Sequence, residues 1–203
     1  FIKNSKIDYD ERTVEGDSIY FDRKRNFASA TNNIKVTDTL NKSTVKGHYA
    51  EVFKAKDSVF ITKRAIAITK RENDSIYIHS DTLMITGPPE ARIIRGFYNA
   101  KMYKSDLSGK ADSIHINQKT GLTQLINFYN NDDKDPFTKR RYPVLWHHEN
   151  QITGDSIHLI SNSKTETLDS LKVFQNAFVI SKDSLGSGFN QIKGKRLNGL
   201  FES

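Results

Sequence analysis

The sequence has no cysteine and only four prolines in 203 residues. The lack of cysteine excludes a disulfide framework, cysteine-ligated zinc, iron–sulfur clusters and thiol nucleophiles. Long apolar runs are also missing, and none approaches the roughly 18 residues that a membrane-spanning helix requires. The chain begins at Phe1 without a methionine or a signal peptide, so we expect a processed start or a piece of a longer protein.

Basic residues outnumber acidic ones by 31 to 24, which gives a formal net charge of +7. An excess of this size favours acidic partners such as anionic lipid or a phosphorylated glycolipid. A nucleic-acid partner is not expected, because the basic residues are spread along the chain rather than gathered in a recognisable motif. The 20 Ile and 8 Val, against 12 Leu and 10 Ala, favour strands over helices.

One short phrase recurs along the chain: Asp, then Ser or Thr, an apolar residue, any residue, and a second apolar residue. Asp and Ser side chains close turns by bonding to nearby backbone, and alternating apolar residues indicate a strand with one buried face. We interpret each phrase as a turn followed by a strand, and the chain as an all-β fold of antiparallel strands with essentially no helix. The complete phrases begin at Asp17, Asp57, Asp74, Asp81, Asp112, Asp155 and Asp169.

Residues 127–143 interrupt this pattern with Asn, Asp and two prolines, and we predict the longest loop there. Because the phrase continues on both sides, we expect residues 1–203 to form one continuous region; a domain boundary in the loop is the alternative. The loop carries Lys139, Arg140 and Arg141 next to aromatic residues. This basic run is a candidate phosphate-binding site, and a solvated loop tip is the simpler alternative.

Two phrases resemble a catalytic motif, the Gly-Asp-Ser nucleophile block of a lipase and esterase superfamily. They contain Ser18 and Ser156. A nucleophilic serine needs a base and an oxyanion hole around it, whereas the same Asp-Ser pair recurs along a chain with no credible helix. We therefore expect no catalytic residue and no enzymatic activity.

Metal or cofactor binding is not expected either. The six histidines show no metal-ligand spacing, and on a strand His147 and His148 would point to opposite faces.

Four sequence blocks stand out in the second half of the chain: Pro-Val-Leu-Trp at 143–146, Asn-Gln-Ile-Thr-Gly-Asp-Ser-Ile at 150–157, Asn-Ala-Phe-Val-Ile at 176–180 and Asn-Gln-Ile-Lys-Gly-Lys at 190–195. In these blocks the chain resembles the OstA-like family, which includes the LptA- and LptC-type lipopolysaccharide-transport proteins, in the form found in Bacteroidetes-type bacteria. The upstream phrases agree with the order of segments in that family.

The resemblance implies an elongated open β-jellyroll in the periplasm, without enzymatic activity. Its two sheets would hold the acyl chains of lipid A and carry lipopolysaccharide toward the outer membrane. Edge strands would pair with other OstA-like components or with a second copy. The alternative is a structural or assembly module of the cell envelope that binds no lipid. The expected groove residues are Ile19, Phe21, Val59, Ile61, Ile76, Ile78, Leu83, Ile85, Ile114, Ile116, Trp146, Ile157 and Leu159.

The prediction that Ser18 and Ser156 belong to turns and have no catalytic role can be tested directly. We expect Ser18→Ala and Ser156→Ala to leave any turnover of short-chain ester substrates at the background rate of the unmodified protein. Ester hydrolysis that disappears in either variant would overturn this expectation.

Overall fold

The computed structural model describes residues 2–9, 11–40, 42–70, 74–105, 107–127, 142–162, 167–183 and 186–201. The described residues form strands, two single turns of 3₁₀-helix and no α-helix, which confirms the all-β prediction. The elements are β1 (Ile2–Tyr9), β2 (Arg12–Asp22), β3 (Phe27–Asp38), β4 (Ser43–Phe53), η1 (Lys54–Lys56), β5 (Ser58–Lys70), β6 (Ser75–Thr86), η2 (Pro89–Ala91), β7 (Ile93–Lys104), β8 (Leu107–Asn117), β9 (Leu122–Ile126), β10 (Val144–His147), β11 (Asn150–Thr153), β12 (Ser156–Ser161), β13 (Leu168–Lys182) and β14 (Phe189–Leu200).

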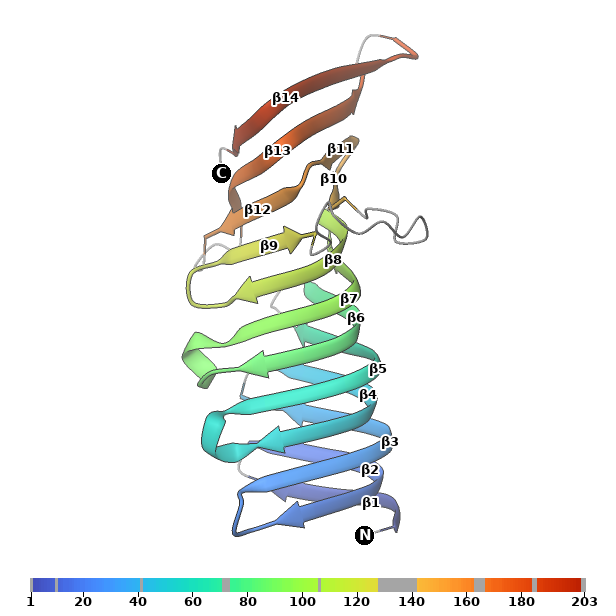
Figure 1. Ribbon diagram of the computed structural model, residues 1–203, viewed down its shortest axis with the longest axis vertical. Coiled ribbons are helices and arrows are strands. Elements are labelled where there is room, and N and C mark those ends of the chain that lie inside the picture. Colours follow the sequence, from blue (N-terminus) through green and yellow to red (C-terminus); the bar gives the residue numbers. More distant parts are fainter. Residues whose placement is uncertain are drawn as a thin grey trace, which may run out of the picture.

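The strands stack as an antiparallel meander along the long axis of the molecule (Figure 1). Strands β1 to β8 follow one another in sequence order. β8 then pairs with β10 through its first half and with β9 through its second half. β13 pairs in the same way with β12 and β11, so β9 and β10 form one level of the stack and β11 and β12 the next.

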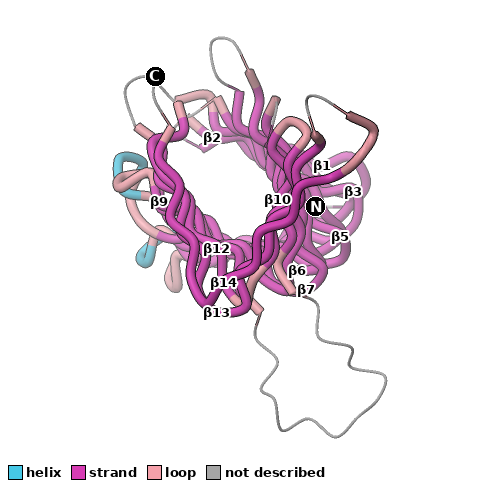
Figure 2. Tube along the Cα trace, turned by 90° about the horizontal axis from the view of Figure 1, so that it is seen from above, coloured by secondary structure: helices cyan, strands magenta, loops and turns pink. Residues whose placement is uncertain are grey.

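Each long strand bends near its middle, and the bends divide the sheet into two facing layers. In β2 and β3, residues 12–15 and 34–38 belong to one layer, named layer A here, and residues 18–22 and 27–31 to the other, named layer B. The register between neighbouring strands shifts at each bend. Viewed along the long axis, the strands curve around a common interior (Figure 2).

The bends have a specific backbone cause. Four strands contain two successive residues with left-handed φ: Asn32–Asn33 in β3, Lys63–Arg64 in β5, Tyr98–Asn99 in β7 and Gln175–Asn176 in β13. Each pair is a β-bulge, which bends the strand and increases its twist. Left-handed backbone costs about 1 kcal/mol or more for a residue other than glycine, and asparagine tolerates it best.

Aspartates in or next to neighbouring strands secure three of these bulges. The amide of Asn33 donates to Asp17 at 2.9 Å, that of Asn99 to Asp81 at 2.7 Å and that of Asn176 to Asp155 at 3.0 Å. The backbone N–H of Asp155 also donates to the carbonyls of Phe174 and Gln175. These aspartates therefore hold the corners of the fold.

The positions of the aspartates correct the prediction that each repeated phrase is a turn followed by a strand. Asp57 and Asp74 do precede strands, as predicted. Asp17, Asp81 and Asp112 instead lie inside β2, β6 and β8, at the bend and not at a hairpin turn. A short polar side chain suits both places because it bonds to backbone that leaves the regular ladder.

The strands that flank residues 127–143 belong to the same sheet. β9 ends at the corner opposite Ser113, and β10 begins there opposite Lys110. The segment thus connects layer B to layer A within one level of the stack. No helix among the described residues is long and apolar enough to cross a membrane.

Close packing at the corners predicts a large effect of one methyl group. A Cβ on Gly47 would collide with the Ile61 side chain and lie 3.1 Å from the Thr62 carbonyl oxygen. We expect Gly47→Ala to lower the free energy of unfolding by about 1–3 kcal/mol, as overpacking does. Urea unfolding measures this, and Gly188→Ala is the control because no atom lies within 4 Å of its Cβ position. Equal midpoints for the two variants would contradict the prediction.

Candidate functional site

The inner face of layer B carries two continuous rows that run along the stack and are apolar except for Thr123. Residues directly opposite each other on successive strands form each row, so the rows follow from the register. The deeper row contains Ile19, Ala30, Ala50, Ile61, Leu83, Gly96, Ile114, Leu125, Ile157, Val173 and Leu197. The second row, nearer the hairpin ends of layer B, contains Phe21, Ala28, Val52, Val59, Ile85, Ile94, Ile116, Thr123, Leu159, Leu171 and Gly199.

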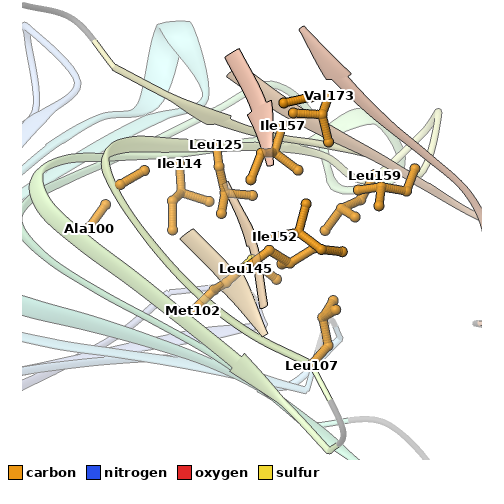
Figure 3. Packing of buried hydrophobic residues seen from close by; sticks show 13 residues of the cluster. Ala100, Met102, Leu107, Ile114, Leu125, Leu145, Ile152, Ile157, Leu159 and Val173 are labelled. Carbon is orange, nitrogen blue, oxygen red and sulfur yellow. The ribbon is translucent and has the colours of Figure 1, made fainter. Parts of the chain in front are cut away.

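Layer A supplies a third row that faces these two. Met102, Leu145 and Ile152 from layer A pack in one cluster with Ile114 and Ile157 from layer B (Figure 3). The row comprises Ile7, Val14, Val36, Val45, Ala67, Ile78, Met102, Gly109, Leu145, Ile152, Val179 and Ile192. Most of these residues lie outside the repeated phrases, so the phrases did not predict them as groove residues.

The structure brings twelve of the thirteen expected groove residues to this interior. Ile61, Leu83, Ile114 and Ile157 are completely buried, whereas Phe21 is 46% exposed at the rim. The other seven, buried or partly buried, are Ile19, Val59, Ile76, Ile78, Ile85, Ile116 and Leu159.

Trp146 does not line the interior, contrary to expectation. Successive side chains of a strand point to opposite faces, and its neighbour Leu145 occupies the inner one. On the outer face, the Trp146 indole N–H donates to Gln151 at 2.9 Å, and the Lys110 ammonium lies 5.4 Å from the ring centroid. The phosphate-binding candidates Lys139, Arg140 and Arg141 lie outside the described residues.

The described side chains fill most of the space between the layers, where two cavities lie among them. The larger, of about 170 Å³, lies among Ile78, Ile94, Met102, Ile116 and Leu159. The smaller, of about 110 Å³ and almost wholly apolar, lies nearer the N-terminal end. Both are below the roughly 300 Å³ usual for a ligand pocket. A long hydrocarbon chain therefore enters only if the layers separate or the side chains between them move.

A charged cluster crosses between the layers at the hairpin ends of the strands. Asp38 Oδ2 accepts a hydrogen bond from Arg12 Nε at 3.2 Å and forms an ion pair with Arg92 Nη1 at 2.9 Å. Arg12 and Asp38 are partners on β2 and β3 in layer A, and Arg92 directly precedes β7. The side chains of Asp38 and Arg92 are only 8% and 9% exposed. The sequence offers no local signal for a cluster whose members are this far apart.

The outer face of layer B carries a polar row with two half-buried histidines. His115 and His158 both lie opposite Gln124. Burial lowers the pKa of His115, and Arg95 adds to this effect. Burial likewise lowers the pKa of His158, with a further contribution from Lys172. Among the described residues, no group of three or more His, Asp or Glu side chains is placed to hold a metal ion.

These features define an elongated antiparallel β-jellyroll with an apolar space between two layers. No protein-family model and no curated protein matches the sequence. A solved structure of the same fold is that of LptH from Pseudomonas aeruginosa, described as the LptA homologous periplasmic component of the conserved lipopolysaccharide transport device. The two share 14% identity with a TM-score of 0.55, over 66% of this chain and 92% of LptH. The likeness establishes the OstA-like fold.

The lowered histidine pKa values predict a loss of stability in mild acid. The unfolded chain takes up these protons near the ordinary value of 6.5, whereas the folded protein takes them up only at lower pH. The unfolded state thus binds more protons below pH 6.5, so the free energy of unfolding falls as the pH drops from there toward the folded pKa values.

Urea unfolding at pH 7 and pH 5 measures this loss. We expect His115→Gln and His158→Gln each to reduce the pH dependence. A variant that keeps the pH dependence of the wild-type protein would contradict the assignment to that histidine.

Proposed function

We propose that the protein is a non-enzymatic periplasmic carrier that binds the acyl chains of lipid A between its two layers and passes lipopolysaccharide toward the outer membrane. The observation that carries the proposal is the continuity of the apolar rows through successive levels of the stack. Such rows suit an extended hydrocarbon chain, since burial of each CH₂ contributes about 0.8 kcal/mol. The net charge of +7 suits a phosphorylated headgroup.

The likeness to LptH supports the fold on which this proposal rests, and its described role in lipopolysaccharide transport supports the substrate class. The blocks at residues 143–146 and 190–195 support a place among the Bacteroidetes-type members. A structural module of the cell envelope is the competing function, in which the same rows serve only as a closed core. Native mass spectrometry of protein purified from a lipopolysaccharide-producing host separates the two, because only the carrier retains glycolipid.

A carboxylate in the interior provides the matching mutational test. Ile116 lines the larger cavity and is partly exposed, so Ile116→Asp places an ionised group where an acyl chain would lie. Desolvation of that charge costs several kcal/mol, and we expect glycolipid binding to be abolished. Ile78→Asp, at a more buried position of the same cavity, should have the same effect.

Leu40→Asp is the control, because Leu40 is 65% exposed in the turn after β3. Circular dichroism verifies that each variant folds. Binding that persists in folded Ile78→Asp and Ile116→Asp variants would assign the rows to a closed core and favour the structural module.

The same proposal includes association through edge strands. Within the described residues, β1 pairs only with β2 and β14 only with β13, so each end of the stack presents unpaired backbone groups. At the C-terminal end the layer A row finishes at Ile192, which is 60% exposed. A second copy, or another component with this fold, could add a strand here and extend both the sheet and its apolar row.

We expect weak association that increases with concentration, measured by sedimentation velocity over a wide concentration range. Ile192→Lys should shift the equilibrium toward monomer because a charge on an edge strand opposes pairing. Leu40→Lys, remote from both terminal strands, should not. A strictly monomeric protein that binds no OstA-like partner would remove end-to-end assembly from the proposal and leave a solitary carrier.

A further inference from the structure

The Arg12–Asp38–Arg92 cluster has more positive than negative charge. Two guanidinium groups share a single carboxylate oxygen, and neither arginine has another acidic partner in the described structure. Asp38 and Arg92 are nearly inaccessible to water, and Arg12 is 27% exposed. Water therefore screens the second positive charge poorly, and a partly buried cation attracts an anion more strongly than an exposed one.

The guanidinium group also favours a particular class of anion. Its planar set of N–H donors matches the oxygens of a phosphate or carboxylate and binds them with two parallel hydrogen bonds. In the cluster, Arg12 and Arg92 approach one oxygen atom from different layers. An anion that binds both arginines would link layer A to layer B as Asp38 does.

The cluster borders the smaller interior cavity and is joined through the backbone to a residue of the larger one. Arg12 lines the smaller cavity, whose walls include Val14, Ile19 and Val36. The carbonyl of Arg92 accepts the backbone N–H of Gln118, which lines the larger one. An anion at the cluster would thus sit next to the apolar space of the smaller cavity.

Further basic residues lie in and near the lining of the smaller cavity. Lys54 is part of its lining, and the backbone N–H of Lys54 donates to the Asn26 carbonyl, which fixes η1 beside the β2–β3 turn. Lys24, Arg25 and Lys56 are exposed at the same hairpin tips. These residues make the approach to the cluster positive and favour the arrival of an anion.

We propose that Arg12 and Arg92 bind the anionic headgroup, a phosphate or carboxylate, of an amphiphile whose hydrocarbon chain occupies the adjoining cavity. Asp38 holds the two guanidinium groups in place and competes with the headgroup for them. The inference rests on the proposed function, since it requires a chain between the layers. Beyond that function, the inference names the residues that bind the headgroup. It also identifies the Asp38 carboxylate as the group that the ligand displaces from the arginines.

Two probes with the same chain separate the inference from the proposed function. Dodecyl phosphate carries an anionic headgroup and dodecyl maltoside a neutral one. Both are titrated below their micelle concentrations by isothermal calorimetry, and inorganic phosphate is the probe without a chain. We expect dodecyl phosphate to bind the wild-type protein about tenfold more tightly than dodecyl maltoside, and inorganic phosphate to bind more weakly than dodecyl phosphate.

The variants should change the affinities in opposite directions. Arg92→Gln should weaken dodecyl phosphate binding about tenfold and leave dodecyl maltoside within twofold of wild type. Asp38→Asn should strengthen dodecyl phosphate binding, because it removes the competing carboxylate. Arg196→Gln, which removes an equal charge from an exposed position on β14, should have little effect. If Arg92→Gln fails to fold, Arg92→Lys and Asp38→Asn test the headgroup site in its place. The lysine variant should still bind dodecyl phosphate more tightly than dodecyl maltoside.

Each contrary result has a defined meaning. Equal binding of the two dodecyl probes, or an equal loss of both in Arg92→Gln, overturns the headgroup site and leaves the proposed function standing. Weaker dodecyl phosphate binding in Asp38→Asn overturns the competition and assigns the cluster to structure alone. Equal affinity for inorganic phosphate and dodecyl phosphate overturns the amphiphile and leaves a free-anion site. If neither dodecyl probe binds, the proposed function itself fails.

Discussion

The bend in each long strand is the constraint on which the rest of this structure depends. A meander of straight strands would form one sheet with an exposed apolar face. Pairs of residues with left-handed backbone, such as Asn32–Asn33 and Tyr98–Asn99, turn the strands so that the second half of each covers the first. The bulges repeat along the stack, and the two layers therefore enclose one interior.

The bends also decide which side chains face that interior. In β6 and β8 the inner rows of the two layers are joined by steps of five residues, from Ile78 to Leu83 and from Gly109 to Ile114. An odd step means that the alternation of buried and exposed residues changes phase at the corner. Asp81 and Asp112 lie within these steps. The repeated phrase thus marks the points at which the pattern restarts, and its chemistry serves the backbone and not catalysis.

The interior combines apolar rows with one charged link. Packing accounts for cohesion within each level, because side chains such as Ile114 and Ile157 from layer B meet Leu145 from layer A. The Arg12–Asp38–Arg92 cluster adds a charged contact between the layers. The proposed carrier function uses both properties: walls that pack when empty, and a contact between the walls that would exchange for a contact with cargo.

The sequence by itself determined the strand content and the residues of the apolar pairs, because alternation and β-branched composition are local properties. It placed Ile61 and Ile157 in the interior without knowledge of their partners. It could not place Trp146, since the face of a strand depends on register with its neighbours, and here Leu145 occupies the inner one. Only the tertiary structure brought Asp38 to Arg92, because a contact between two layers depends on how both bend and not on any pattern along the chain.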